Sequence, residues 1–114
     1  MDAPELSGTA RELIGDQNSE VYVSAVSAWE IVIKAAEGRL LFPEAPHTYV
    51  VSRKIANQMQ GLPIEISHAL EVSRLEDHHR DPFDRLLVAQ CRVESLKLVS
   101  ADPVLRKYPV DVIW

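Results

Sequence analysis

Short apolar segments typical of buried strands alternate with segments of helical periodicity along the chain. This alternation predicts an α/β domain around a mostly parallel sheet. Helices are predicted near residues 7–15 and at 25–37, 47–60, 68–75 and 82–95, and strands at 20–24, 62–67, 96–100 and 110–114. In such a sheet, functional side chains gather beyond the carboxyl ends of the strands. The loops after Val23 and Val99 are therefore the places where a site is expected.

The length of 114 residues allows a single domain, 1–114, with one sizeable core. The sequence has 12 basic and 17 acidic side chains, so its net charge is −5. This charge argues against a surface that binds nucleic acid through an overall positive charge. An enzyme that holds a phosphate backbone through metal ions is still possible. A single cysteine, Cys91, forms no internal disulfide, and the chain shows neither a membrane span nor a signal peptide. We therefore expect a cytoplasmic protein with no membrane contact.

Glu30 is the first candidate functional residue. On a helical wheel it falls at the edge of the apolar arc formed by Val26, Trp29 and Ile33. A carboxylate turned toward buried surface carries a desolvation cost unless a metal or another cation compensates for it. A salt bridge to Lys34, four residues further on and in the favourable order, is the alternative explanation. The pattern leaves the metal ligand and the ion pair both open.

A second acidic group lies at the start of the helix predicted at 82–95. Asp81 is placed to cap this helix, Pro82 stands at its first position, and Asp84 lies near the positive end of the helix dipole. Capping alone explains why acids occur here. The same geometry would also let an acid of the first turn point into the cleft above the sheet, where it could bind a metal.

A third acid, Asp102, follows the predicted strand 96–100 and precedes Pro103. Capping of the next helical turn is again the structural explanation. Hard cations such as Mg²⁺ and Mn²⁺ prefer oxygen ligands, and they can activate water and stabilise the attacking and leaving oxygens of a phosphodiester displacement. Glu30, Asp84 and Asp102 come from three separate elements and so form a candidate metal site.

Two blocks of the sequence resemble motifs of a known family. Residues 24–40 contain SAVSAWEI followed by IK and GRL, and residues 79–90 read HRDPFDRLLVAQ. These blocks are similar to the second and third motifs of PIN-domain ribonuclease toxins of the VapC type. The segment LVSAD at 98–102, together with Tyr108, resembles the fourth. The similarity extends from about Ala3 to Trp114.

The resemblance implies a PIN-like three-layer α/β/α domain and a Mg²⁺- or Mn²⁺-dependent endoribonuclease, the toxin of a type II toxin–antitoxin module. Its implied partners are an RNA substrate, a VapB-type antitoxin and a second copy of the chain in a homodimer. By this resemblance Glu30 and Asp84 match metal-binding catalytic acids, and Asp102 matches a more variable fourth acidic position. Asp81 would be an accessory acid or a helix cap.

Three further side chains are candidates around this site. Ser100 could help hold a water molecule at the metal. Arg80 and Arg85 could steer RNA toward the cleft, because arginine suits bidentate contact with phosphate. Charge pairing of these arginines with neighbouring acids is the alternative.

The start of the chain departs from the family pattern. Members usually open with a central apolar strand that ends in Asp, whereas Asp2 of this chain follows no strand. We therefore expect the first strand and its catalytic Asp to be missing, which would leave unpaired backbone edges in the middle of the sheet. A misplaced start codon, a truncated gene or a trimmed chain would explain this. An intact mass of the native protein that matches Met1 as the true start would exclude misannotation.

A different kind of function is the main alternative. A catalytically impaired, truncated PIN remnant could act only as an antitoxin-binding or dimerisation module. Metal binding distinguishes the two, since an intact acid cluster should gain thermal stability from Mn²⁺. A DNA-binding regulator is disfavoured, because no helix-turn-helix pattern with a basic recognition helix is present and the net charge is negative.

Overall fold

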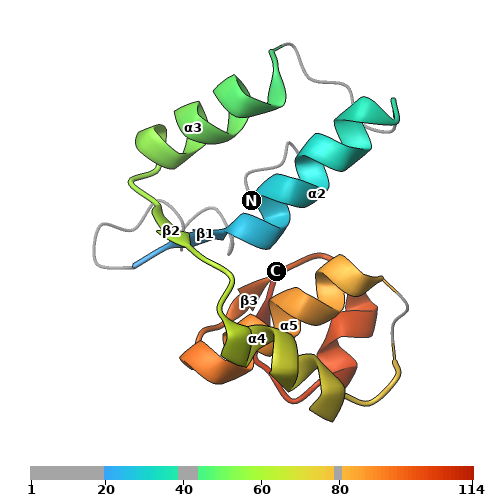
Figure 1. The fold of residues 1–114 in the computed structure, drawn as a ribbon. Coiled ribbons are helices and arrows are strands. Elements are labelled where there is room, and N and C mark those ends of the chain that lie inside the picture. The colour runs from blue at the N-terminus through green and yellow to red at the C-terminus, as the bar shows by residue number, and fades with distance from the viewer. Residues whose placement is uncertain (1–19, 39–43, 79–80) are drawn as a thin grey trace.

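The computed structural model of the protein describes residues 20–38, 44–78 and 81–114. The elements in this part of the chain alternate between helices and short strands, which confirms the α/β class (Figure 1). In chain order they are β1 (Tyr22–Ser24), α2 (Ala25–Ala36), α3 (Pro46–Ala56), β2 (Gln60–Leu62), α4 (Ile66–Glu71), η1 (Val72–Arg74), α5 (Pro82–Glu94), β3 (Leu98–Val99), η2 (Pro103–Lys107) and β4 (Val112–Ile113).

All strand pairs of the described residues are parallel, as predicted. β1 pairs with β2 from Tyr22 opposite Gln60 onward, and β3 pairs with β4 from Leu98 opposite Val112. Within the described residues the strands form two sheets of two strands each. The helix predicted near 7–15 and the region of the expected first strand lie outside the described residues, so those predictions remain untested.

Side-chain caps fix where the main helices begin. The Ser24 hydroxyl accepts a hydrogen bond from the Val26 N–H at 3.0 Å and so starts α2 at the end of β1. The Asp81 carboxylate accepts from the Phe83 N–H at 2.9 Å at the start of α5. Both starts agree with the prediction from sequence. α2 ends at Ala36, and Gly38, just beyond it, has a φ of +71°, the left-handed conformation that favours glycine.

The predicted helix 47–60 and strand 62–67 are placed wrongly. The helix, α3, ends at Ala56, and the strand, β2, is Gln60–Leu62. Two features stop the helix: the Asn57 side chain donates to the Arg53 carbonyl at 3.0 Å, and Gln58 takes a left-handed φ of +53°. Pairing with β1, which is distant in sequence, then selects the residues that form the strand.

The short helix predicted at 68–75 also begins earlier, at Ile66, and continues as η1 from Val72. Its start is a reciprocal cap in which the Glu65 N–H donates to His68 Nδ1 at 3.0 Å. The strands predicted at 96–100 and 110–114 are shortened to β3 and β4.

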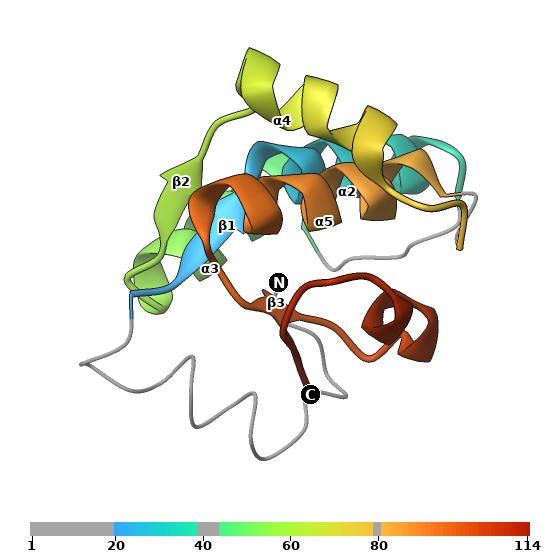
Figure 2. The ribbon, with the colours of Figure 1, turned by 90° about the horizontal axis from the view of Figure 1, so that it is seen from below.

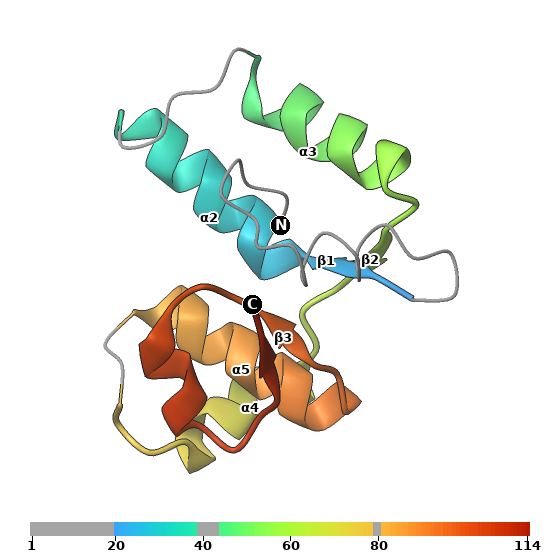
Figure 3. The same cartoon turned by 180° about the vertical axis from the view of Figure 1, so that it is seen from behind.

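The buried core lies mostly in one half of the molecule. α5 packs between α4 and the β3–β4 sheet (Figure 2), around a cluster of buried residues: Leu75, Val88, Ala89, Cys91, Leu98, Leu105 and Tyr108. Seen from behind, α2 and α3 lie with β1 and β2 in the other half (Figure 3). There Val23 and Met59 form a smaller buried cluster. Among the described residues, no helix is both long and apolar enough to cross a membrane.

Candidate metal centre

Three carboxylates converge where the two halves of the molecule meet. Glu30 comes from α2, Asp81 caps α5, and Asp84 lies in the first turn of α5. One oxygen from each lies within 4.8 Å of the others, and all three residues are half-buried. Two elements far apart in the sequence thus build one acidic group.

A contact between aromatic rings holds these elements together beside the acids. Trp29 and Phe83 meet edge to face, with ring centroids 5.1 Å apart, a geometry that aromatic pairs prefer. Trp29 precedes Glu30 and Phe83 precedes Asp84 in the chain. The ring contact therefore places the two carboxylates close together.

Glu30 also forms the predicted ion pair. Its carboxylate lies 2.6 Å from Lys34 Nζ, one helical turn further along α2. Glu30 thus forms the ion pair and also belongs to the acidic group. An ion pair with Lys34 and a role as a metal ligand therefore do not exclude each other. The Lys34 ammonium supplies a positive charge that lowers the repulsion among the three carboxylates.

The donor set suits a hard divalent cation. Mg²⁺ takes oxygen ligands at about 2.0–2.1 Å in an octahedron, so opposite ligands are about 4.2 Å apart. The separation of at most 4.8 Å among the three oxygens needs only small side-chain adjustments to match this. No histidine or cysteine belongs to this group of described residues, which disfavours zinc.

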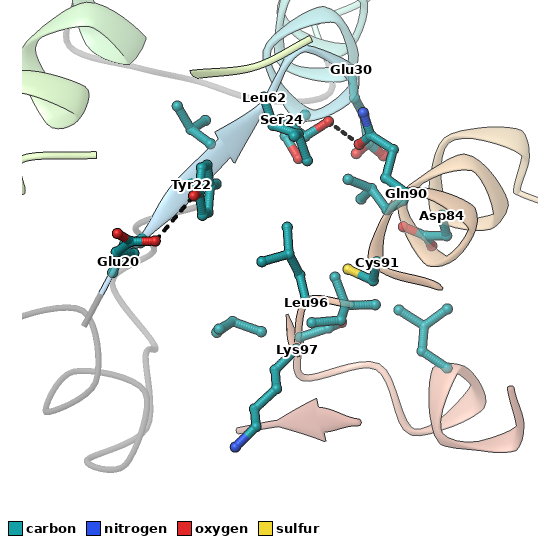
Figure 4. A pocket seen from close by; sticks show the side chains of 18 of the residues that line it. Glu20, Tyr22, Ser24, Glu30, Leu62, Asp84, Gln90, Cys91, Leu96 and Lys97 are labelled. Atoms are coloured by element: carbon teal, nitrogen blue, oxygen red, sulfur yellow. Dashed lines mark hydrogen bonds between the residues drawn. The ribbon is translucent and has the colours of Figure 1, made fainter. Parts of the chain in front are cut away.

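A cavity of about 550 Å³ lies between the two sheets (Figure 4). Along its wall run β1 on one side and the residues from Leu96 to Ser100 on the other, and both Glu30 and Asp84 border it. A substrate segment that entered this cavity would meet two members of the acidic group. The candidate metal centre therefore lies at the wall of a cavity that a substrate could enter.

Asp102 has another place in the structure. Its carboxylate accepts from the Val104 N–H at 2.9 Å and caps η2, and its own N–H donates to the Ser100 hydroxyl at 3.1 Å. The group of three converging acids does not include it. Ser100 lines the cavity together with Glu30 and Asp84. The catalytic role of Asp102 and the accessory role of Ser100 remain predictions.

The Arg85 guanidinium is engaged within the fold. It donates to the Glu76 carbonyl at 3.0 Å and the Val72 carbonyl at 3.3 Å, and to the Tyr108 hydroxyl at 3.3 Å. These bonds hold the segment before α5 against the helix, so Arg85 can contribute to a substrate surface only by giving some of them up. Arg80, the other candidate for phosphate contact, lies outside the described residues.

Two groups near the cavity have raised pKa values. The neighbouring Glu20 carboxylate raises the pKa of Tyr22, because a phenolate beside it would be repelled. Burial raises the pKa of the Cys91 thiol to about 11. Cys91 is therefore a protonated side chain at neutral pH, without the thiolate that a nucleophile or a metal ligand needs.

Gln90 is a buried polar residue that the sequence analysis missed. It lies on α5, and its side-chain oxygen accepts from the Ser24 hydroxyl at the end of β1 (Figure 4). Its side-chain nitrogen donates to the Pro63 carbonyl at 3.1 Å. The sequence signal that could have identified it is a glutamine among Val88, Ala89 and Cys91 on the helix predicted at 82–95.

Parallel strands, flanking helices and three converging carboxylates define an α/β domain with a candidate site for a divalent metal. The model of the PIN domain family matches residues 2–111. The chain therefore belongs to the PIN domain family, whose members are generally nucleases. Comparison with curated proteins gives no match.

Proposed function

We propose that this protein is a metal-dependent endoribonuclease that hydrolyses RNA phosphodiester bonds as the VapC-type toxin of a type II toxin–antitoxin module in the cytoplasm. The observation that carries the proposal is the convergence of Glu30, Asp81 and Asp84 within a PIN domain. The resemblance of residues 24–40 and 79–90 to two VapC motifs supports the narrower assignment.

Glu30, Asp81 and Asp84 would hold the cation, for which we propose Mg²⁺ or Mn²⁺. When bound, such a cation lowers the pKa of a water molecule and neutralises the charge that develops on the phosphate oxygens. The chain's own contribution is to bring three acids from α2 and α5 into one group. The Ser27 and Ser100 side chains line the adjoining cavity and offer hydroxyls to a phosphate or to water.

Lys34 would have two roles at this centre. Without a cation it neutralises Glu30 across 2.6 Å. A cation that binds Glu30 competes with this ammonium, and the displaced Lys34 side chain would then be available to an RNA phosphate. This local positive charge matters because the chain as a whole carries a net charge of −5.

Exposed apolar side chains on α2 and α3 support a protein partner. Trp29 and Val32 on α2, and Val51 and Ile55 on α3, are exposed, Ile55 to 72%. α2 and α3 also pack against each other. We propose this surface as the contact for a VapB-type antitoxin, and we propose a homodimer for the toxin. Light scattering of the purified chain checks the dimer, and co-purification with an antitoxin, compared between wild type and Ile55→Lys, checks the surface.

The test of the enzymatic function is RNA cleavage by the purified chain with Mn²⁺, with and without EDTA. We expect cleavage that EDTA abolishes and that Asp84→Asn loses, because Asn keeps the shape of the side chain but removes the charge. Asp111→Asn is the matched control, since Asp111 is exposed and lies outside the acidic group. Cleavage that survives EDTA or Asp84→Asn would exclude the proposed metal centre.

A non-catalytic binding module is the second candidate, and the exposed surface of α2 and α3 favours it. Such a module would bind antitoxin or a second copy through that surface without cleaving RNA. Binding of the antitoxin by a chain that shows neither Mn²⁺ binding nor cleavage would support this alternative. Cleavage that depends on Mn²⁺ and on Asp84 would exclude it.

A further inference from the structure

Gln90 connects three separate segments of the chain from a buried position. Only 1% of it is exposed. Its Oε1 accepts from the Ser24 hydroxyl, its Nε2 donates to the Pro63 carbonyl at 3.1 Å, and the same nitrogen lies 3.3 Å from His68 Nδ1. One side chain on α5 thus contacts the end of β1, the segment after β2, and α4.

Each of these partners is itself held in place. The Ser24 hydroxyl also accepts from the Val26 N–H and so caps α2. His68 Nδ1 accepts from the Glu65 N–H at 3.0 Å, which leaves Nε2 to donate to Glu94 at 2.7 Å. No buried side-chain nitrogen or oxygen in the described part of the chain lacks a partner. Removing one member of this network would leave a buried polar atom unpaired, which is costly.

The Ser24–Gln90 hydrogen bond and the acid cluster are the same number of residues apart on the segment that contains α2 and on α5. Ser24 precedes Glu30 by six residues on one chain segment, and Asp84 precedes Gln90 by six residues on the other. At 1.5 Å per residue, six residues span about 9 Å of helix. The helices α2 and α5 therefore meet at two points, the Ser24–Gln90 hydrogen bond and the Trp29–Phe83 ring contact beside the acids.

Two contacts constrain a pair of helices more than one contact does. The ring contact alone would fix the separation of α2 and α5 near the acids but would let the helices pivot about it. The buried hydrogen bond, about 9 Å further along, prevents that pivot. A small rotation about the ring contact would change the direction in which the Glu30 and Asp84 carboxylates point, which a metal with strict geometry tolerates poorly.

We propose that Gln90 is a positioning residue for the acid cluster: through its bond to Ser24 it locks the angle between α2 and α5 and so sets how the Glu30 and Asp84 carboxylates point toward each other. This inference rests on the proposed function, since it assigns to Gln90 the geometry of the proposed metal centre. In this role Gln90 acts through Ser24 and is not itself a ligand of the metal.

The experiment compares four variants in a Trp114→Phe background, where Trp29 is the only tryptophan. Gln90→Met removes the amide at similar volume. Ser24→Gly removes the same hydrogen bond from the other side at little cost in capping, and Ser24→Thr keeps the hydroxyl. Leu75→Ala is the matched control, because it weakens the core cluster around α5 without lining the cavity between the sheets. All are measured well below their melting temperatures.

Two readouts are taken, the dissociation constant for Mn²⁺ by calorimetry and the near-ultraviolet circular dichroism of Trp29, which depends on how its ring lies against that of Phe83. Gln90→Met and Ser24→Gly should weaken Mn²⁺ binding by about tenfold, the size typical of groups that orient metal ligands. Both should also change the Trp29 signal, because a pivot of α2 on α5 alters the angle between the Trp29 and Phe83 rings. Ser24→Thr should restore both readouts, and Leu75→Ala should change neither.

Unchanged Mn²⁺ affinity in Gln90→Met and Ser24→Gly would overturn the proposal, and so would an equal loss in Leu75→Ala. Absence of Mn²⁺ binding by the wild type would overturn the proposed metal centre itself. In that case the circular dichroism of Trp29 alone decides whether Gln90 locks α2 against α5: a changed signal in both variants supports the lock, and an unchanged signal excludes it.

Discussion

At the scale of single residues, Glu30 shows how one side chain can serve stability and function together. Its ion pair with Lys34 at 2.6 Å accounts for an acid on a half-buried helix face, and its place beside Asp81 and Asp84 makes it a candidate ligand. A bound cation and the Lys34 ammonium would then share one carboxylate. Lys34 therefore weakens metal binding even though it stabilises the protein without metal.

This competition predicts the effect of Lys34→Met. Removing an ammonium close to Glu30 should tighten Mn²⁺ binding by about fivefold, the factor that corresponds to about 1 kcal/mol of screened repulsion. The protein without metal should lose about 0.3–0.5 kcal/mol of unfolding free energy, the usual value of such a pair on a helix. Calorimetric titration with Mn²⁺ checks the first effect, with Lys107→Met as a control on an exposed residue. Weaker binding in Lys34→Met would show that Lys34 organises the site rather than competing with the cation.

Cys91 carries a prediction on pH. Burial raises the pKa of its thiol from 9.0 to about 11, so the folded protein keeps the proton where the unfolded chain loses it. Stability from this thiol is thus fully present below pH 9 and is lost as the pH rises through about 11. The loss is on the order of 2 to 3 kcal/mol. Urea unfolding of wild type and Cys91→Ala between pH 8 and 11 should show a difference that shrinks with pH, and a constant difference would contradict it.

At the scale of elements, the sequence predicts best what is decided locally. Ser24 and Asp81 cap their helices with side chains two residues from the N–H groups they accept, and both starts were predicted. Parallel pairing was also predicted, from the alternation of strands and helices. Local signals of this kind need no knowledge of the rest of the fold.

Elements that depend on distant partners were predicted less well. β2 contains the exposed residues Gln60 and Gly61, which carry no apolar pattern, and it becomes a strand only by pairing with β1. The meeting of Glu30 with Asp81 and Asp84 likewise depends on how α2 packs on α5. The sequence singled out these acids, with Asp81 as an accessory acid or cap, but it could not show that the three meet.

The two capping aspartates allow a paired prediction. Asp81 caps α5 and belongs to the acid cluster, whereas Asp102 caps η2 and does not. Replacing either with Ala should cost about 1 kcal/mol of unfolding free energy through the lost cap. Only Asp81→Ala should also weaken Mn²⁺ binding, by about tenfold or more.

Chemical denaturation and Mn²⁺ titration of both variants distinguish the two roles. The comparison is balanced because each variant loses one cap. A loss of Mn²⁺ affinity in Asp102→Ala would support the metal-binding role that the sequence predicts for Asp102.

At the scale of the whole molecule, the acid cluster joins two halves. Glu30 belongs to the half that contains β1 and β2, whereas Asp81 and Asp84 belong to the half that contains β3 and β4 (Figure 1). A cation bound to all three acids would act as a cross-link between the halves. Metal should therefore stabilise the entire fold rather than one loop.

The corresponding prediction concerns thermal unfolding. At a Mn²⁺ concentration 100 times its dissociation constant, linkage adds about 2.7 kcal/mol to the unfolding free energy, which raises the Tm by about 10 °C for a domain of this size. Calorimetric scans with Mn²⁺ and with EDTA measure the shift. Asp84→Asn should abolish it, and a shift of the same size in that variant would place the bound metal elsewhere.

The cavity between the two sheets has a consequence for solubility. β1 and β3 border the cavity from opposite sides, while β2 and β4 cover their other edges. Exposed strand edges are templates for aggregation between molecules, and opening of the contact between α2 and α5 would widen the cavity that β1 and β3 border. Aggregation through β1 and β3 should therefore become faster as the two halves separate more often. The same contacts that assemble the acid cluster would thus also limit this route to fibrils.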